Sequence, residues 1–159
     1  MKANKILPWL SLALYRPLIP QNTGNIGRTC VGLDIPLSII GRPGFSLDDA
    51  SVKRAGLDYW ANLSLHLYEG WESFFAENPG ERCWFFTKQG KTSLFEADVC
   101  RGDVFVFGQE TLGLPAFILE KYPSQTLYLP MPGSVRSYNL SNTAAVAAFE
   151  AYRKLTTGK

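Results

Sequence analysis

Six short apolar runs, separated by segments of helical composition, limit the folds open to this chain more than any other feature of its sequence. Runs of this length are typical of strands, and the segments between them carry the caps and periodicity of helices. The predicted strands span residues 12–16, 37–41, 63–68, 82–88, 103–108 and 126–131. The predicted helices lie near residues 23–28 and over 48–56, 70–80, 115–123 and 140–155. This alternation predicts an α/β fold with a mainly parallel sheet of about six strands flanked by helices.

The chain has 159 residues, which is the length of one ordinary domain. We predict a single domain over residues 12–159, preceded by an N-terminal extension, residues 1–11, to which no role is assigned. An apolar run at 6–15 follows two lysines, as in a secretory signal, but Pro8 breaks it and no small-residue cleavage site follows. No apolar stretch approaches the roughly 20 residues of a membrane span, so we expect no membrane association.

Charge and cysteine content narrow the possible functions. The 16 basic and 14 acidic residues leave a formal net charge of +2, which is too small to indicate a nucleic-acid partner by itself. Cys30, Cys83 and Cys100 are widely spaced, form no CxxC pair and are accompanied by one histidine. We therefore expect no metal site, and reduced thiols in a cytoplasmic protein.

Glycine and polar residues concentrate where the predicted strands end, and ligands of open parallel sheets bind beyond the carboxyl ends of the strands. The first such segment is PQNTGNIGRTC at 20–30, with Asn22 in a tight polar turn and Arg28 on the first turns of a helix. Helix N-termini attract anions because their N–H groups are unpaired. The turn is also compatible with a plain helix cap, whereas Arg28 near other polar loops needs a charged partner or a substrate.

The second segment, FGQETLGLP at 107–115, ends a strand and opens a helix. Gly108 and Gly113 would allow the backbone to approach a ligand closely. Glu110 either caps the helix that opens at residue 115, pairs with a nearby arginine, or serves the site. The glycine spacing fits neither the dinucleotide-binding nor the nucleoside-triphosphate-binding pattern, so we do not expect a site of either kind.

The third segment, LPMPGSVRSYNLSNTAAV at 129–146, runs from a strand through a Pro-Gly turn into an alanine-rich helix. Its polar residues before and at the helix start are Arg136, Ser137, Asn139, Ser141 and Asn142. Ser141 or Asn142 could cap the helix, but one helix start uses fewer polar side chains than this, which favours a functional role. The helix also carries small residues that suit close packing against another helix or a second subunit, namely Ala144, Ala145, Ala147 and Ala148.

Together these segments resemble the conserved motifs of the SPOUT superfamily of RNA methyltransferases, and within it the TrmL (YibK-like) tRNA 2′-O-methyltransferases. The resemblance rests on NTGNIGR at 22–28, FGQETLGLP at 107–115 and LPMPGSVRSYNLSN at 129–142, and it extends to RAGLDY at 54–59. It covers roughly residues 12–155. One motif alone would be modest evidence, whereas three in this order and at this spacing are highly specific.

The resemblance implies a trefoil knot in the C-terminal part of the domain and a homodimer whose active site uses residues of both subunits. It also implies S-adenosylmethionine as cofactor, S-adenosylhomocysteine as product and no metal. Matched by position, the cofactor-binding residues would be Phe86, Gly108, Glu110, Leu129 and Ser137. The catalytic residues would be Arg28, Ser137 and Asn139. Further motif residues, which would contact the substrate or organise the site, are Asn22, Arg136 and Asn142.

The activity so implied is 2′-O-methylation of the wobble nucleotide, cytidine or uridine, in the tRNA anticodon loop. Arg28 is expected to stabilise negative charge on the 2′-oxygen, while Ser137 and Asn139 hold the ribose or the methionine end of the cofactor. Side chains expected to contact the RNA are Arg42, Lys53, Arg54, Tyr59, Lys88, Lys91 and Tyr138. Two alternatives stay open: methylation of another tRNA position or of ribosomal RNA, and a catalytically silent RNA-binding dimer of the same fold.

Overall fold

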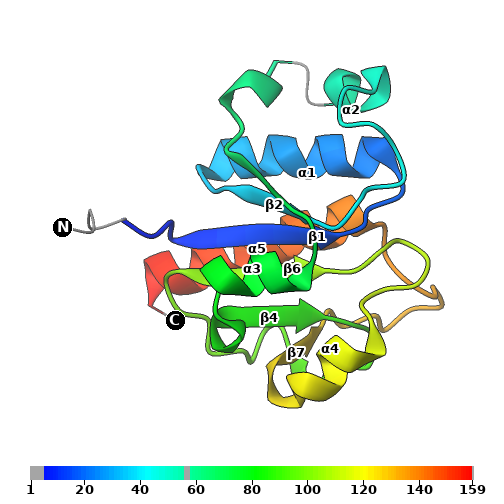
Figure 1. The fold of residues 1–159 in the computed structure, drawn as a ribbon. Helices are drawn as coiled ribbons and strands as arrows, with labels where there is room; N and C mark the ends of the chain where they lie inside the picture. The colour runs from blue at the N-terminus through cyan, green and yellow to red at the C-terminus, as the bar shows by residue number, and fades with distance from the viewer. Residues whose placement is uncertain (1–5, 56–57, 159) are drawn as a thin grey trace.

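The strands form one parallel sheet with helices on both faces (Figure 1). The structure, a computed structural model, describes residues 6–55 and 58–158. Its strands are β1 (Leu10–Tyr15), β2 (Leu37–Ile40), β3 (Leu65–Tyr68), β4 (Cys83–Phe86), β5 (Thr92–Ser93), β6 (Asp103–Phe107) and β7 (Thr126–Tyr128). Its α-helices are α1 (Pro20–Leu33), α2 (Ala50–Ala55), α3 (Trp71–Glu77), α4 (Ala116–Lys121) and α5 (Leu140–Thr157), with 3-10 turns η1 (Trp60–Asn62), η2 (Gly80–Arg82) and η3 (Pro123–Gln125). The described strands pair in the order β3-β2-β1-β6-β4-β7-β5, every neighbour parallel, which confirms the predicted fold class.

The elements lie close to their predicted positions, with three differences. β1 begins at Leu10 rather than at residue 12, because Leu10 and Ser11 pair with β6, so these two residues of the predicted extension belong to the sheet. β5 adds a seventh strand that is too short, at two residues, to show as an apolar run. The first helix is longer than the predicted segment and begins at Pro20, since proline suits the first position of a helix.

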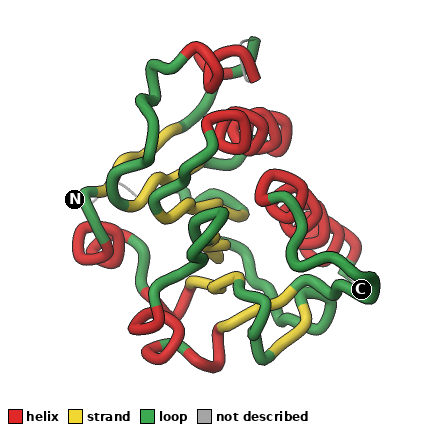
Figure 2. Tube along the Cα trace, turned by 90° about the vertical axis from the view of Figure 1, so that its right-hand side faces the viewer, coloured by secondary structure: helices red, strands yellow, loops and turns green. Residues whose placement is uncertain are grey.

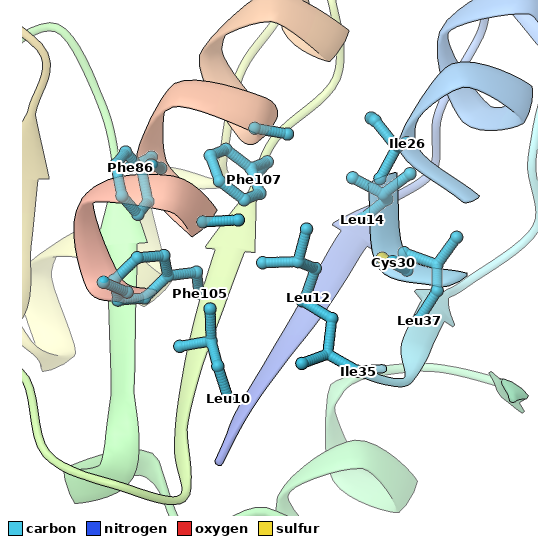
Figure 3. Packing of buried hydrophobic residues seen from close by; sticks show 14 of the residues in the cluster. Leu10, Leu12, Leu14, Ile26, Cys30, Ile35, Leu37, Phe86, Phe105 and Phe107 are labelled. Carbon is cyan, nitrogen blue, oxygen red and sulfur yellow. The ribbon is translucent and has the colours of Figure 1, made fainter. Parts of the chain in front are cut away.

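Two hydrophobic clusters attach the helices to the sheet, with α1 and α5 on one face and α3 and α4 on the other (Figure 2). Because successive residues of a strand point to opposite faces, Leu12 and Leu14 of β1 enter the first cluster and Ala13 enters the second. Figure 3 shows the two leucines between Ile26 of α1 and Phe107 of β6. Burial on both faces explains why the central strands read as continuous apolar runs.

Small residues on α5 let this helix pack closely against its own chain. Ala144, Ala147 and Ala148 have no exposed surface and belong to the cluster that includes β1. α5 contacts both α1 and β1. The sequence predicted that these alanines pack against another helix or a second subunit. In the structure they pack against another helix, α1, and against the sheet.

The segment that follows β4 wraps around β7. β7 lies between β4 and β5, and its Leu127 and Tyr128 carbonyls accept hydrogen bonds of 2.9 Å from the Thr87 and Leu94 amides. Between these two amides, a Cβ atom on Gly90 would lie 2.4 Å from the Leu127 carbonyl carbon, so only glycine fits without a shift. Residues 87–94 thus cross β7 from its β4 side to its β5 side, in the part of the chain where the resemblance places the knot.

Candidate active site

The loops that follow β4, β6 and β7 meet at the carboxyl edge of the sheet and enclose a cavity of about 650 Å³. In Figure 1 this edge lies to the right, where the strand arrows end. The lining residues come from segments 86–89, 107–119, 127–131 and 137–143, together with Ile19 and Asn22. This volume lies in the usual range for small-molecule sites. The three strand-end loops therefore form one site, beside the start of α1.

Glu110 joins the second motif to the first. Its carboxylate accepts hydrogen bonds from the backbone amides of Leu18, at 2.8 Å, and Ile19, at 3.0 Å, and from the Asn22 side-chain amide at 3.4 Å. Leu18 and Ile19 lead directly into α1 and Asn22 lies in its first turn, so the carboxylate sits near the N-terminus of this helix, where a negative charge is stabilising. The predicted alternative, a cap on the helix that opens at residue 115, is wrong, because α4 has no side-chain cap and Glu110 instead binds the segment that leads into α1.

Asn139 joins the third motif to the first. Its amide nitrogen donates to the Asn22 side-chain oxygen at 3.0 Å, and its own side-chain oxygen accepts from the amides of Ser141, at 2.9 Å, and Asn142, at 3.3 Å. α5 begins at Leu140, so Asn139 is its N-cap, and the expectation that Ser141 or Asn142 caps this helix is wrong. We call Glu110, Asn22 and Asn139 the inner corner of the site, since they connect all three motifs.

Gly108 is required by the loop itself. A Cβ atom at this position would lie 2.1 Å from the Gly113 carbonyl carbon and 2.3 Å from the Leu114 nitrogen. Gln109 and Gly113 exchange backbone hydrogen bonds of 3.1 and 3.2 Å, and Gly113 adopts φ +65°, which favours glycine. Both glycines therefore close the loop on itself, and the closed loop then lines the cavity.

The remaining predicted cofactor residues also line the cavity. Phe86 is buried and stacks on Phe107 with ring centroids 4.5 Å apart, while Leu129 is half-buried and Ser137 is exposed. The sequence did not single out Leu114 or Leu119, which bring apolar surface from the loop before α4 and from α4 itself. No pattern marks them, because an apolar residue facing a cavity reads like any core residue.

Arg28 lies apart from this cavity. It is exposed on α1, six residues after Asn22, and does not belong to the lining of the cavity of its own chain. The Arg28 guanidinium donates to the Tyr59 hydroxyl at 3.2 Å, and the Cζ atom of this guanidinium lies 4.7 Å from the centroid of the Tyr59 ring. We call Arg28 and Tyr59 the outer arm. The structure therefore does not bring the predicted catalytic arginine to the cavity within one chain.

Arg136 and Asn142 are exposed and also lie outside the cavity lining. Of the predicted RNA contacts, two line the cavity, namely Lys88 and Tyr138. The other five do not: Arg42, Lys53, Arg54, Tyr59 and Lys91. Across residues 6–55 and 58–158 the structure contains no group of three or more His, Cys, Asp or Glu side chains that could hold a metal ion. None of the helices in this part of the chain is long and apolar enough to cross a membrane.

The fold and the cavity agree with an α/β methyltransferase, and the chain belongs to one family of these enzymes. The profile of the SpoU rRNA Methylase family matches residues 10–149. Membership brings with it the SPOUT fold and its knot, as the resemblance implied. A tRNA (cytidine(34)-2′-O)-methyltransferase of Burkholderia cenocepacia is 44% identical over 147 residues, which cover 91% of this chain and 94% of that protein.

Solved structures support the same assignment. One, from a study of the 2-OH methylation of C/U34 on tRNA, is 45% identical and has a TM-score of 0.88, covering 94% of this chain and 97% of that one. The SpoU methyltransferase AviRb from Streptomyces viridochromogenes, in complex with the cofactor AdoMet, has a TM-score of 0.82 and 22% identity, covering 97% of this chain and 63% of that one. At this identity the likeness to AviRb concerns the fold alone.

Proposed function

We propose that this chain is an S-adenosylmethionine-dependent methyltransferase that acts on the 2′-oxygen of nucleotide 34, the wobble position, in tRNA, with cytidine or uridine as the target. The observation that carries the proposal is the meeting of all three motifs at one cavity, in a chain 44% identical to a tRNA (cytidine(34)-2′-O)-methyltransferase over nine-tenths of its length. A tRNA substrate agrees with the predicted cytoplasmic location.

The cavity has the chemistry that S-adenosylmethionine requires. Its lining combines buried apolar side chains, such as Phe86 and Leu127, with exposed polar ones, such as Lys88 and Ser137. The apolar side suits an adenine ring, and the polar side suits the charged methionine end. When bound, S-adenosylmethionine supplies a methyl group already activated on a sulfonium. We assign its binding to Phe86, Gly108, Leu129 and Ser137, with Glu110 acting through the loop that it anchors.

The residues of the chain then align the ribose and stabilise its developing charge. The 2′-hydroxyl becomes a good nucleophile only as its proton departs, so a cation near this oxygen lowers the barrier. Arg28 provides that cation, and the exposed Ser137 hydroxyl holds the ribose or the methionine end. Both ends of the Asn139 side chain are already hydrogen-bonded within the inner corner, so Asn139 acts as a positioning residue.

Because Arg28 does not line the cavity of its own chain, we include in the proposal a homodimer in which it serves the cavity of the other copy. α5 supplies a surface for it: Val146, Phe149 and Tyr152 are 46%, 57% and 46% exposed. Their three-residue spacing places them on one side of the helix. An exposed apolar stripe of this kind is typical of a protein–protein interface.

Methyl transfer from radiolabelled S-adenosylmethionine to bulk tRNA, followed by mass mapping of the product, tests the proposed activity. We expect one added methyl group, on the ribose of nucleotide 34. A methyl group at another position, or in ribosomal RNA only, would contradict the proposed specificity. Binding of the donor without transfer to any RNA would contradict the enzymatic role and favour the silent RNA-binding dimer.

Mixing two defective variants tests the shared site. Arg28→Ala keeps its cavity but lacks the arginine, whereas Gly108→Val keeps the arginine but has a distorted cavity loop. If Arg28 reaches across the dimer, heterodimers contain one complete site, and activity returns on mixing. The control is a mixture of Arg28→Ala with an Arg28→Ala, Gly108→Val double variant, which should stay inactive. Equal inactivity of both mixtures would contradict a shared site.

A further inference from the structure

Resting on the proposed function, we infer that Tyr59 is a positioning residue, which holds the Arg28 guanidinium in the orientation that the acceptor ribose requires. Tyr59 closes the RAGLDY segment, 54–59, to which the sequence assigned only a possible contact with RNA. In the structure this tyrosine contacts the predicted catalytic arginine directly.

One tyrosine holds the guanidinium in two ways. The central carbon of Arg28 lies 4.7 Å from the ring centroid, and a terminal nitrogen donates to the hydroxyl of the same ring at 3.2 Å. The ring contact places the charge over an aromatic face, and the hydrogen bond restricts rotation of the guanidinium plane. An exposed arginine otherwise samples many rotamers, so these contacts reduce the entropy that would be lost when it meets the ribose.

The segment that follows Tyr59 packs against the turn of α1 that carries Arg28. A Cβ atom on Gly27 would lie 3.2 Å from both Trp60 and Leu63, so the absence of a side chain at Gly27 lets the η1 segment pack on α1. Tyr59 immediately precedes η1, and its carbonyl accepts the Asn62 amide at 2.9 Å. Tyr59 and Arg28 therefore lie on two segments that pack against each other, the segment around η1 and helix α1.

An aromatic support has an advantage that a carboxylate lacks. Within the described part of the chain, the two ion pairs are Arg82–Asp103 and Arg153–Glu150, so Arg28 has no carboxylate partner there. A carboxylate would neutralise the guanidinium and occupy two of its donors. Tyr59 orients Arg28 while leaving its charge and most of its five N–H donors available to an oxyanion or a phosphate.

Single-turnover methyl transfer by two variants tests this inference. Tyr59→Leu should lower the rate by about 10- to 100-fold, and Tyr59→Phe, which keeps the ring and loses the hydroxyl, by about 2- to 10-fold. Affinity for S-adenosylmethionine should stay unchanged in both. Tyr68→Leu is the matched control, since it removes a half-buried, hydrogen-bonded tyrosine from the opposite face of the sheet, and it should keep the wild-type rate.

A double-mutant cycle shows whether Tyr59 acts through Arg28. Lysine lacks the planar guanidinium that Tyr59 orients, so Tyr59→Leu should reduce the rate of an Arg28→Lys enzyme by less than about 3-fold. The same 10- to 100-fold loss in both backgrounds would mean that Tyr59 acts on its own, for example by contacting RNA, and would overturn the inference. So would a wild-type rate in Tyr59→Leu. Failure of the proposed function is a separate result, because the unmodified enzyme would then transfer no methyl group to tRNA.

Discussion

Helix α1 links the inner corner to the outer arm, since it carries Asn22 and, six residues later, Arg28, yet the two groups are built in opposite ways. In the inner corner, Asn22 bonds both Glu110 and Asn139, which also bond the segment leading into α1 and the first turn of α5, over distances of 2.8 to 3.4 Å. In the outer arm, Arg28 is exposed and is held by an aromatic ring that does not neutralise it.

This difference shows that the residues that fix the shape of the site are not the residue that can act on a substrate. Groups whose hydrogen bonds are already satisfied can fix the shape of a cavity, but they have little left to offer a substrate. A cation that keeps its charge can act on a substrate, but in this chain it lies outside the cavity lining. We therefore expect substitutions in the outer arm to reduce catalysis with the fold intact, and substitutions in the inner corner to reduce folding and cofactor binding together.

Arg28→Ala should have the largest effect on activity. Removing one group that stabilises a developing oxyanion commonly costs about 100- to 1,000-fold in turnover, and we expect a loss of at least this size. Because Arg28 is exposed, the free energy of unfolding and the affinity for S-adenosylmethionine should hardly change. Steady-state kinetics, calorimetric titration of the cofactor and urea unfolding measure the three quantities. Near-normal turnover would remove Arg28 from the mechanism.

Glu110→Ala should show the opposite pattern. It leaves the Leu18 and Ile19 amides and the Asn22 side chain without their acceptor, which should lower the free energy of unfolding by about 1–3 kcal/mol. Urea unfolding measures this change, and cofactor affinity should fall with it. Glu110→Gln, which retains one acceptor oxygen, should lose less. An unchanged stability in Glu110→Ala would show that the inner corner does not hold the site together.

Gly108→Ala should affect cofactor binding with a smaller loss of stability. The added methyl group would displace the loop from its contact with Gly113, and we expect S-adenosylmethionine affinity to fall about 10-fold, which corresponds to roughly 1.4 kcal/mol. Gly133→Ala is the matched control, because a Cβ atom there has no neighbour within 4 Å. Equal affinities of the two variants would contradict the need for a closed loop.

The smallest predicted effect concerns Cys30, which lies on α1 two residues after Arg28 and faces the core. Burial raises the pKa of this thiol from 9.0 to about 12, so the folded state disfavours the thiolate. The stability that depends on the protonated thiol is complete below pH 9 and is lost as the pH rises from 9 towards 12. Between pH 8 and 9.5 this loss should be about 0.8 kcal/mol in urea unfolding. A Cys30→Ala variant should lack this component, and an identical pH profile would contradict it.

Sequence patterns predicted most of the sheet, because each central strand is a continuous apolar run and each main helix carries its own signals. They missed β5, whose two residues pair with β7 only because residues 87–94 wrap around that strand. The sequence patterns also predicted two helix caps that the structure does not show, one by Glu110 and one by Ser141 or Asn142. Glu110 is 92 positions from the Leu18 amide that donates to it, and local spacing contains no information about such a contact.

The motifs identified the residues of the site, but their placement needed the fold. Asn22, Glu110 and Asn139 are recognisable by type and by the strands and helices that flank them, since glycine- and asparagine-rich turns follow from local backbone preferences. That these three side chains bond one another, whereas Arg28 points away to Tyr59, depends on how α1 packs against the strand-end loops and against η1. Local preferences act within a few residues along the chain, and the division between inner corner and outer arm arises from contacts between segments far apart in it.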